Sequence, residues 1–152
     1  SGLATTQCGE LVVENVSSYG HERAGFRLGA SGSVQVSNCY AANCGDGGFV
    51  PVSGSTGISL SRCTAVGCGQ VDSQDGFRLV GIRHVVLDDC AAYRNEGAGV
   101  MVLNGCSDVL IKGGIFADNG RSTTPVTRRD SRSGIGIKSF GKPNERISIL
   151  GV

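Results

Sequence analysis

The stretch SNCYAANCGDGGFVPV, residues 37–52, places two cysteines five positions apart, and the same spacing returns 24 residues later in SRCTAVGCGQ. An alternating apolar pair precedes each copy, and this pair recurs along the chain at intervals of 23, 24, 27 and 24 residues. A period of this length predicts a protein built from stacked repeats. The pairs are Leu11/Val13, Val34/Val36, Ile58/Leu60, Val85/Leu87 and Val109/Ile111.

Each repeat holds two more short runs. A three-residue run such as YAA follows the apolar pair, and a glycine-led run such as GFRL comes after it. Three strands of about three to five residues separated by glycine-rich turns fit one coil of a parallel β-helix, whereas a propeller blade needs about 40 residues. We therefore expect an all-β solenoid of about five to six coils, with three short parallel strands per coil.

Stacking coils about 4.8 Å apart places equivalent residues above one another, so each repeated position becomes a column of side chains. Five of the seven cysteines fall in two such columns, which favours buried free thiols over disulfide bonds. A Cys44–Cys68 disulfide, or a zinc site made by Cys39, Cys44, Cys63 and Cys68, is the alternative. The predicted columns are Val16/Cys39/Cys63/Cys90, His21/Cys44/Cys68/Asn95/Asn119 and Phe26/Phe49/Phe77/Val100/Ile135.

The composition is typical of one soluble domain. The chain has 152 residues, a formal net charge of +1, and 25 glycines against five Phe, three Tyr and no Trp. The balanced charge argues against nucleic-acid binding, and no apolar run approaches the roughly 18 residues of a membrane span. Both ends of the sequence cut through a coil without a visible cap, so we expect residues 1–152 to be a single β-helix domain from a longer chain.

The stretches VQVSNC…GDGGF and VLIKGGIFADNG make the chain resemble the right-handed parallel β-helix of the pectin-lyase-like superfamily. The resemblance covers nearly the whole chain and implies a right-handed parallel β-helix. It implies less about activity, because many unrelated functions use this fold. Polysaccharide-active members of the superfamily bind their substrate along one sheet, in a groove walled by the loops at its edges. The matching sheet here is the one formed by the GFRL-type runs.

Charged residues on that sheet, and on the turns that lead into it, form the candidate site. Arg27 and Arg78 are expected to face outward, and Val50, Met101 and Gly136 occupy the equivalent places. Glycoside hydrolysis needs two carboxylates roughly 5–10 Å apart, which neighbouring coils supply. Charged turns that serve only solubility are the alternative. We predict Asp46, Asp75 and Glu96 as catalytic residues, and Glu22, Arg27 and Arg78 as substrate-binding residues.

One repeat is longer than the others. Between Gly114 and Ile135 the chain advances 21 positions, and the extra residues GRSTTPVTRRDSRS form an inserted basic loop at residues 120–133. Arginine binds anionic groups through forked hydrogen bonds. We therefore predict that Arg128 and Arg129 bind an anionic sugar or a neighbouring subunit, with a solvated surface loop as the alternative.

Three functions fit these observations. The first is a phage tailspike or similar spike that binds bacterial cell-surface polysaccharide, and often degrades it, as a homotrimer. The second is a monomeric secreted polysaccharide lyase, glycoside hydrolase or uronate epimerase. The third is a structural β-helix without a sugar site. Free cysteines favour the first, because tailspikes fold in a reducing cytoplasm.

The remaining expectations follow from these hypotheses. A tailspike places the protein on the virion tail, and a secreted enzyme places it outside the cell. We expect no cofactor, no metal, no nucleic-acid partner and no membrane insertion. The motifs of pectate lyases, alginate epimerases and polygalacturonases have no match in the sequence. His21 and His84 lie in different turns without a nearby nucleophile, so we predict them to be turn or surface residues.

Overall fold

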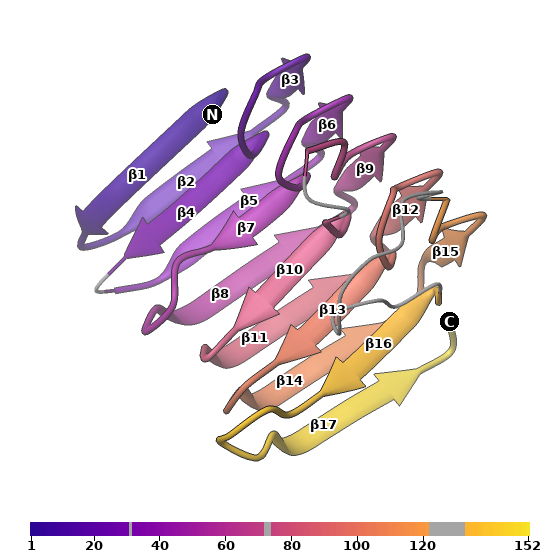
Figure 1. Ribbon diagram of the computed structural model, residues 1–152. Helices are drawn as coiled ribbons and strands as arrows, with labels where there is room; N and C mark the ends of the chain where they lie inside the picture. Colours follow the sequence, from indigo (N-terminus) through magenta and orange to yellow (C-terminus); the bar gives the residue numbers. More distant parts are fainter. Residues whose placement is uncertain (31, 72–73, 122–132) are drawn as a thin grey trace.

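In the computed structural model, which describes residues 1–30, 32–71, 74–121 and 133–152, the chain winds into a stack of coils built of β-strands (Figure 1). Each coil adds one strand to each of three parallel sheets, which we call sheets A, B and C. Sheet A contains β1 (Leu3–Cys8), β4 (Phe26–Ala30), β7 (Phe49–Pro51), β10 (Phe77–Val80), β13 (Val100–Leu103) and β16 (Ile135–Lys138). Sheet B contains β2 (Leu11–Glu14), β5 (Val34–Ser37), β8 (Thr56–Ser61), β11 (Arg83–Asp88), β14 (Ser107–Lys112) and β17 (Glu145–Leu150). Sheet C contains β3 (Ser17–Tyr19), β6 (Tyr40–Ala42), β9 (Thr64–Val66), β12 (Ala91–Tyr93) and β15 (Ile115–Ala117).

The predicted phenylalanine column sets the register of sheet A. Phe26 pairs with Phe49 and Phe49 with Phe77, and the rings stack with centroids 4.7 and 5.0 Å apart. All three side chains are fully buried. Val100 and Ile135 continue the column through β13 and β16. The predicted all-β, parallel fold is thereby confirmed.

At the turn from sheet B to sheet C, the same position of five successive coils holds a residue in the left-handed backbone region, and in the fifth coil Gly114, with φ of 91°, adds a second such residue. The five corner residues at the shared position have φ between 49° and 59°, a conformation that Asn, Asp and Gly adopt most readily. The distance along the chain is constant at this corner, because five positions separate Val13 from Ser18 as they separate Leu60 from Ala65. The corner residues are Asn15, Asn38, Arg62, Asp89 and Gly113.

The two cysteine columns lie inside the helix. Cys39, Cys63 and Cys90 are at most 2% exposed, as predicted, and all seven cysteines are free thiols in the structure. Each stacked thiol donates a weak hydrogen bond to a backbone carbonyl, as Cys63 does to Ser61 at 3.4 Å. Burial raises the pKa of the Cys39 thiol, which disfavours the reactive thiolate. Val16, expected at the head of this column, is 38% exposed on the first coil.

Asparagines continue the second cysteine column. Asn95 is fully buried, and its Oδ1 accepts a hydrogen bond from the backbone N–H of Cys68 at 2.9 Å. Its Nδ2 donates to Oδ1 of Asn119 at 2.8 Å and to the carbonyl of Ala65 at 3.2 Å. The buried amide therefore ties three successive coils together through polar contacts.

The outward face of sheet A is open only in part. Arg27 on β4 is exposed, whereas Arg78 on β10 is half-buried. Met101 on β13 was expected to border an exposed groove, but it is 1% exposed and forms a small apolar cluster with Ala98, Leu103 and Val80. The reason is that Val100 and Val102 fill the interior core, so the alternate residues form a second apolar layer on the opposite face. Gly136 is buried as well, which corrects the expectation for this end of the sheet.

Candidate functional site

The turns from sheet C to sheet A form a pocket on the first coils, lined by Glu22, Arg23, Asp46, Val71 and Gln74. We call it the acidic pocket. Close backbone contacts hold its walls, since the N–H of Gly45 donates to the carbonyl of His21 at 2.7 Å and the N–H of Val71 donates to the carbonyl of Gly45 at 2.9 Å. A Cβ atom on Gly45 would lie 2.0 Å from the carbonyl oxygen of Glu22, so only glycine allows these turns to stack this closely.

The acidic pocket combines two carboxylates with one guanidinium group. Glu22 and Asp46 come from neighbouring coils, and one coil rise is about 4.8 Å. Glu22 and Arg23 are exposed, and Asp46 is half-buried. Within the described part of the chain none of these three residues forms an ion pair. Their polar atoms are therefore available to a ligand that offers hydroxyl or anionic groups.

The structure gives Asp75 a different environment from that of the acidic pocket. Asp75 is 3% exposed; its Oδ2 lies 2.9 Å from Nη1 of Arg78, and its Oδ1 accepts a hydrogen bond from the N–H of Ala98 at 2.8 Å. Burial raises the pKa of Asp75 to about 6, although Arg78 and the N–H of Ala98 oppose the rise. The carboxylate thus links β10 to the turn before β13, and contact with a substrate would require this ion pair to open.

The other predicted residues are distributed around the same edge. Glu96 is half-buried, its N–H donates to the carbonyl of Cys68 at 2.9 Å, and it does not line the acidic pocket. Arg27 is exposed on sheet A. The structure therefore brings Asp46 together with Glu22, predicted only for binding, and not with Asp75 or Glu96. Arg128 and Arg129, together with most of the loop predicted at residues 120–133, lie outside the described residues.

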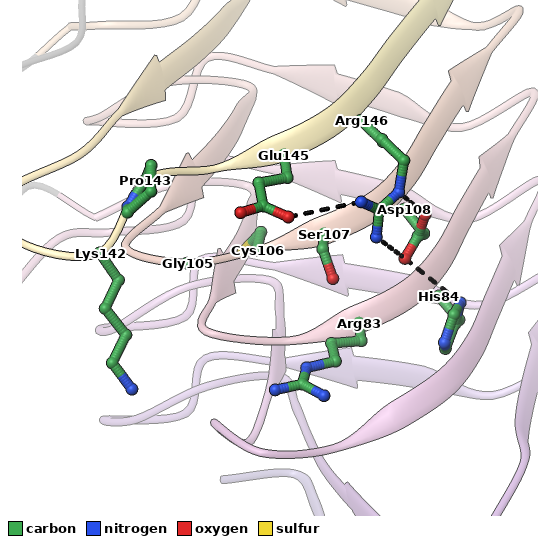
Figure 2. A pocket seen from close by; sticks show the side chains of 10 residues that line it. All are labelled: Arg83, His84, Gly105, Cys106, Ser107, Asp108, Lys142, Pro143, Glu145 and Arg146. Carbon is green, nitrogen blue, oxygen red and sulfur yellow. Dashed lines mark hydrogen bonds and ion pairs between the residues drawn. The ribbon is translucent and has the colours of Figure 1, made fainter.

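A second pocket, of about 450 Å³, lies at the C-terminal ends of the sheet A strands, where the chain turns into sheet B (Figure 2). We call it the mixed-charge pocket. The first residues of β11, β14 and β17 supply most of its side chains, and the turns between β13 and β14 and between β16 and β17 supply the rest. It is lined by Arg83, His84, Gly105, Cys106, Ser107, Asp108, Lys142, Pro143, Glu145 and Arg146.

One arginine pairs with both acids of the mixed-charge pocket. Nη2 of Arg146 donates to Oδ2 of Asp108 at 2.8 Å, and its Nε donates to Oδ1 of the same carboxylate. Nη1 of Arg146 lies 3.4 Å from Oε2 of Glu145, and Nδ1 of His84 lies 3.6 Å from Oδ2 of Asp108. The hydrogen bonds from Arg146 hold the pKa of Asp108 below its usual value.

The sequence analysis missed the mixed-charge pocket. In the structure, the pocket coincides with a column of residues in the left-handed backbone region. They occupy the second position of the sheet B strands, with φ of 53° at His84, 56° at Asp108 and 49° at Arg146. Gly57, with φ of 67°, occupies the preceding coil. Three residues other than glycine in this conformation mark a position where the surrounding structure imposes the backbone geometry.

Comparisons with known proteins address the fold. The model of the family described as "Right handed beta helix region" matches residues 1–147. No curated protein and no solved structure gives a significant match. Over the described ranges, no three His, Cys, Asp or Glu side chains converge in a way that could hold a metal ion. Nor does that part of the chain contain a helix of the length and hydrophobicity needed to cross a membrane.

Proposed function

Because this chain belongs to the right-handed β-helix family, we propose that it binds bacterial cell-surface polysaccharide along the open part of sheet A. The acidic pocket carries this proposal, since it presents two carboxylates and a guanidinium group from neighbouring coils, with no ion pair among the described residues. Carboxylates accept hydrogen bonds from sugar hydroxyls, and arginine donates them in a fork. Exposed Arg27 on β4 extends these polar groups onto the sheet.

A linear polysaccharide suits this surface because both the ligand and the helix repeat along one axis. Each coil offers an equivalent position about 4.8 Å from the next, so successive sugars meet successive turns. The pocket is formed by turns at the sheet edge and not by an enclosed cavity in the core. A polymer that runs across the coils can therefore occupy it without the helix opening.

Depolymerisation is a second candidate function, favoured by the position of Glu22 and Asp46. They line one pocket from neighbouring coils, and glycoside hydrolases hold their acid and base, or acid and nucleophile, roughly 5–10 Å apart. One carboxyl group would protonate the leaving oxygen while the other acts on the opposite side of the glycosidic bond. Asp75 and Glu96 would then support the turns instead of reacting.

We further propose that the chain is part of a tailspike-type, homotrimeric receptor-binding protein on a virion tail. The support is the set of seven free thiols, six of them buried, which suits folding in a reducing cytoplasm. A monomeric secreted polysaccharide lyase, hydrolase or epimerase is the alternative. Light scattering of the full-length protein distinguishes the two, because a monomer would contradict the tailspike proposal.

Removal of both carboxylates tests the binding site. We expect Glu22→Gln/Asp46→Asn to weaken binding to purified O-antigen and capsular polysaccharides at least about tenfold, while the free energy of unfolding changes by only about 0.5 kcal/mol. The matched control is Glu10→Gln/Glu14→Gln, which removes two exposed acids from the start of sheet B. Binding is measured by calorimetry and cleavage by release of reducing ends. Equal binding by the two double variants would rule out the acidic pocket as the site.

A further inference from the structure

The charges of the mixed-charge pocket do not balance. Three cations and two acids line it, and Arg146 contacts both acids. Arg83 and Lys142 are exposed, and neither forms an ion pair with any residue that the structure describes. Two cations that line one pocket repel each other, and an anion bound in the pocket relieves this repulsion.

The fork between Arg146 and Asp108 occupies one end of the pocket. In Figure 2, Arg146, Asp108 and His84 lie together at one end, while Arg83 and Lys142 extend to the same side beneath the strand ends. The acids therefore neutralise only the Arg146 end. The other end carries the unmatched positive charge.

The segment that carries Lys142 is fastened to the coil before it. Oδ1 of Asn144 accepts hydrogen bonds from the N–H groups of Gly105 and Cys106 at 3.1 and 3.0 Å, and its Nδ2 donates to the carbonyl of Lys138 at 2.9 Å. A Cβ atom on Gly105 would lie 2.9 Å from Cβ of Lys142. The absence of a side chain at Gly105 thus allows Lys142 to pass close to the turn between β13 and β14. The hydrogen bonds of the Asn144 side chain hold this segment in place before any ligand binds.

From this geometry we propose that Arg83 and Lys142 form a binding site for an oxyanion, that is, a carboxylate, sulfate or phosphate group. The guanidinium of Arg83 donates two parallel hydrogen bonds to two oxygens of such a group, and the ammonium of Lys142 supplies a second charge. The pocket volume of about 450 Å³ is larger than one inorganic ion needs, and it suits an anionic group carried by a molecule the size of a monosaccharide.

This site is separate from the acidic pocket. The acidic pocket lies at the turns from sheet C to sheet A, whereas Arg83 and Lys142 lie at the turns from sheet A to sheet B. No residue lines both pockets. Anion binding at one edge can therefore be tested whether or not the other edge binds polysaccharide.

The test uses inorganic phosphate, sulfate and glucuronate as probes, with glucose as the neutral probe of similar size, all titrated calorimetrically at constant low ionic strength. We expect saturable binding of at least one anion and none of glucose. Tighter binding of glucuronate than of phosphate or sulfate assigns the oxyanion to a sugar carboxylate, and the reverse order assigns it to a phosphate or sulfate group.

Two matched variants locate the binding. Arg83→Gln/Lys142→Gln is expected to raise the dissociation constant for the anion that binds most tightly at least about tenfold. Arg62→Gln/Lys112→Gln removes the same charges at exposed positions outside the pocket and is expected to bind within about twofold of the original protein. Glu22→Gln/Asp46→Asn should bind the anion normally. The proposal is overturned if no anion binds the original protein saturably, or if both cation variants bind alike.

Discussion

The interior columns and the two edges of sheet A follow opposite rules. Inside the helix, successive coils place the same kind of side chain at the equivalent position, so that the side chains stack in a column, as with Phe26, Phe49 and Phe77. At the edges, each coil differs from its neighbours, and one edge gathers free carboxylates while the other leaves Arg83 and Lys142 unmatched. The repeat therefore carries stability, and departures from the repeat carry the polar groups that can recognise a ligand.

The largest effect that follows from this contrast is expected in the phenylalanine column. Phe49→Ala should lower the free energy of unfolding by about 3–5 kcal/mol, because it removes a fully buried ring between two stacked neighbours and leaves a cavity. Denaturant unfolding followed by circular dichroism measures the loss. Tyr19→Ala, at a side chain that is 60% exposed, should cost about 1 kcal/mol or less. Equal losses would contradict the assignment of stability to the interior.

Asp75 combines features of the interior and of the edges of sheet A, because it is a charged residue of a turn and is nevertheless buried. Its folded pKa of about 6 lies above the reference value of 3.8, so the folded state binds the proton more tightly than the unfolded state does. Its stabilising contribution is complete below about pH 3.8 and is lost as the pH rises through about 6. Between these limits the protein should lose about 3 kcal/mol relative to Asp75→Asn.

The measurement for Asp75 is the free energy of unfolding of both proteins from pH 3.5 to 7.5. Subtracting the profile of Asp75→Asn removes the titration of every other group. Because the N–H of Ala98 and the guanidinium of Arg78 still need partners in the variant, its overall stability is expected to be offset by a constant amount. Parallel profiles across the whole range would show that the buried carboxyl is not the titrating group.

A smaller loss is expected at the asparagine column. Asn95→Ala leaves the buried N–H of Cys68 and the carbonyl of Ala65 without their side-chain partners, which should cost about 1–3 kcal/mol. Asn119→Ala is expected to cost less, because Asn119 is only half-buried and water can replace it. Thermal unfolding of the two variants compares their stabilities. A greater loss of stability for Asn119→Ala than for Asn95→Ala would contradict the finding that Asn95 is the more deeply buried of the two.

The smallest expected effect is none at all. If all seven thiols are free, as in the structure, omission of reductant should not change the unfolding midpoint, and thiol titration after denaturation should count seven. In the native protein only Cys8, which is partly exposed, should react rapidly, since burial protects the others. A denatured count of five or fewer would show that the protein contains a disulfide bond.

The interior was predictable from the sequence because its period is strict. Alternation inside each short strand names the inward residue, and the recurrence of that residue places it above its equivalents. Sequence reasoning therefore located the Phe and Cys columns and the parallel sheets. It did not locate Met101, because β13 is apolar on both faces and alternation then gives no sign of which residues are exposed.

The edges were less predictable because their positions depend on turns of unequal length. Counting back from Phe77 places Asp75 level with Ala24, Gly47 and Ala98, and the small size of these residues signals a buried position that the sequence analysis overlooked. The mixed-charge pocket needed a further step, since the longer turn between β16 and β17 brings Lys142 into the pocket that Arg83 lines. Which turn residues meet in space is a property of how that turn folds back.

The corner between sheets B and C divides the chain into interchangeable units. The length of this corner never varies among the coils described. A deletion or insertion that begins at this corner in one coil and ends at the same corner in the next therefore removes or adds one complete coil, without changing which residues face inward. One extra residue at the same corner would instead turn every following side chain in that strand to the opposite face. Growth or shortening by whole coils, and variation in length at the turns that border sheet A, are thus the changes this architecture accepts during evolution and in protein engineering.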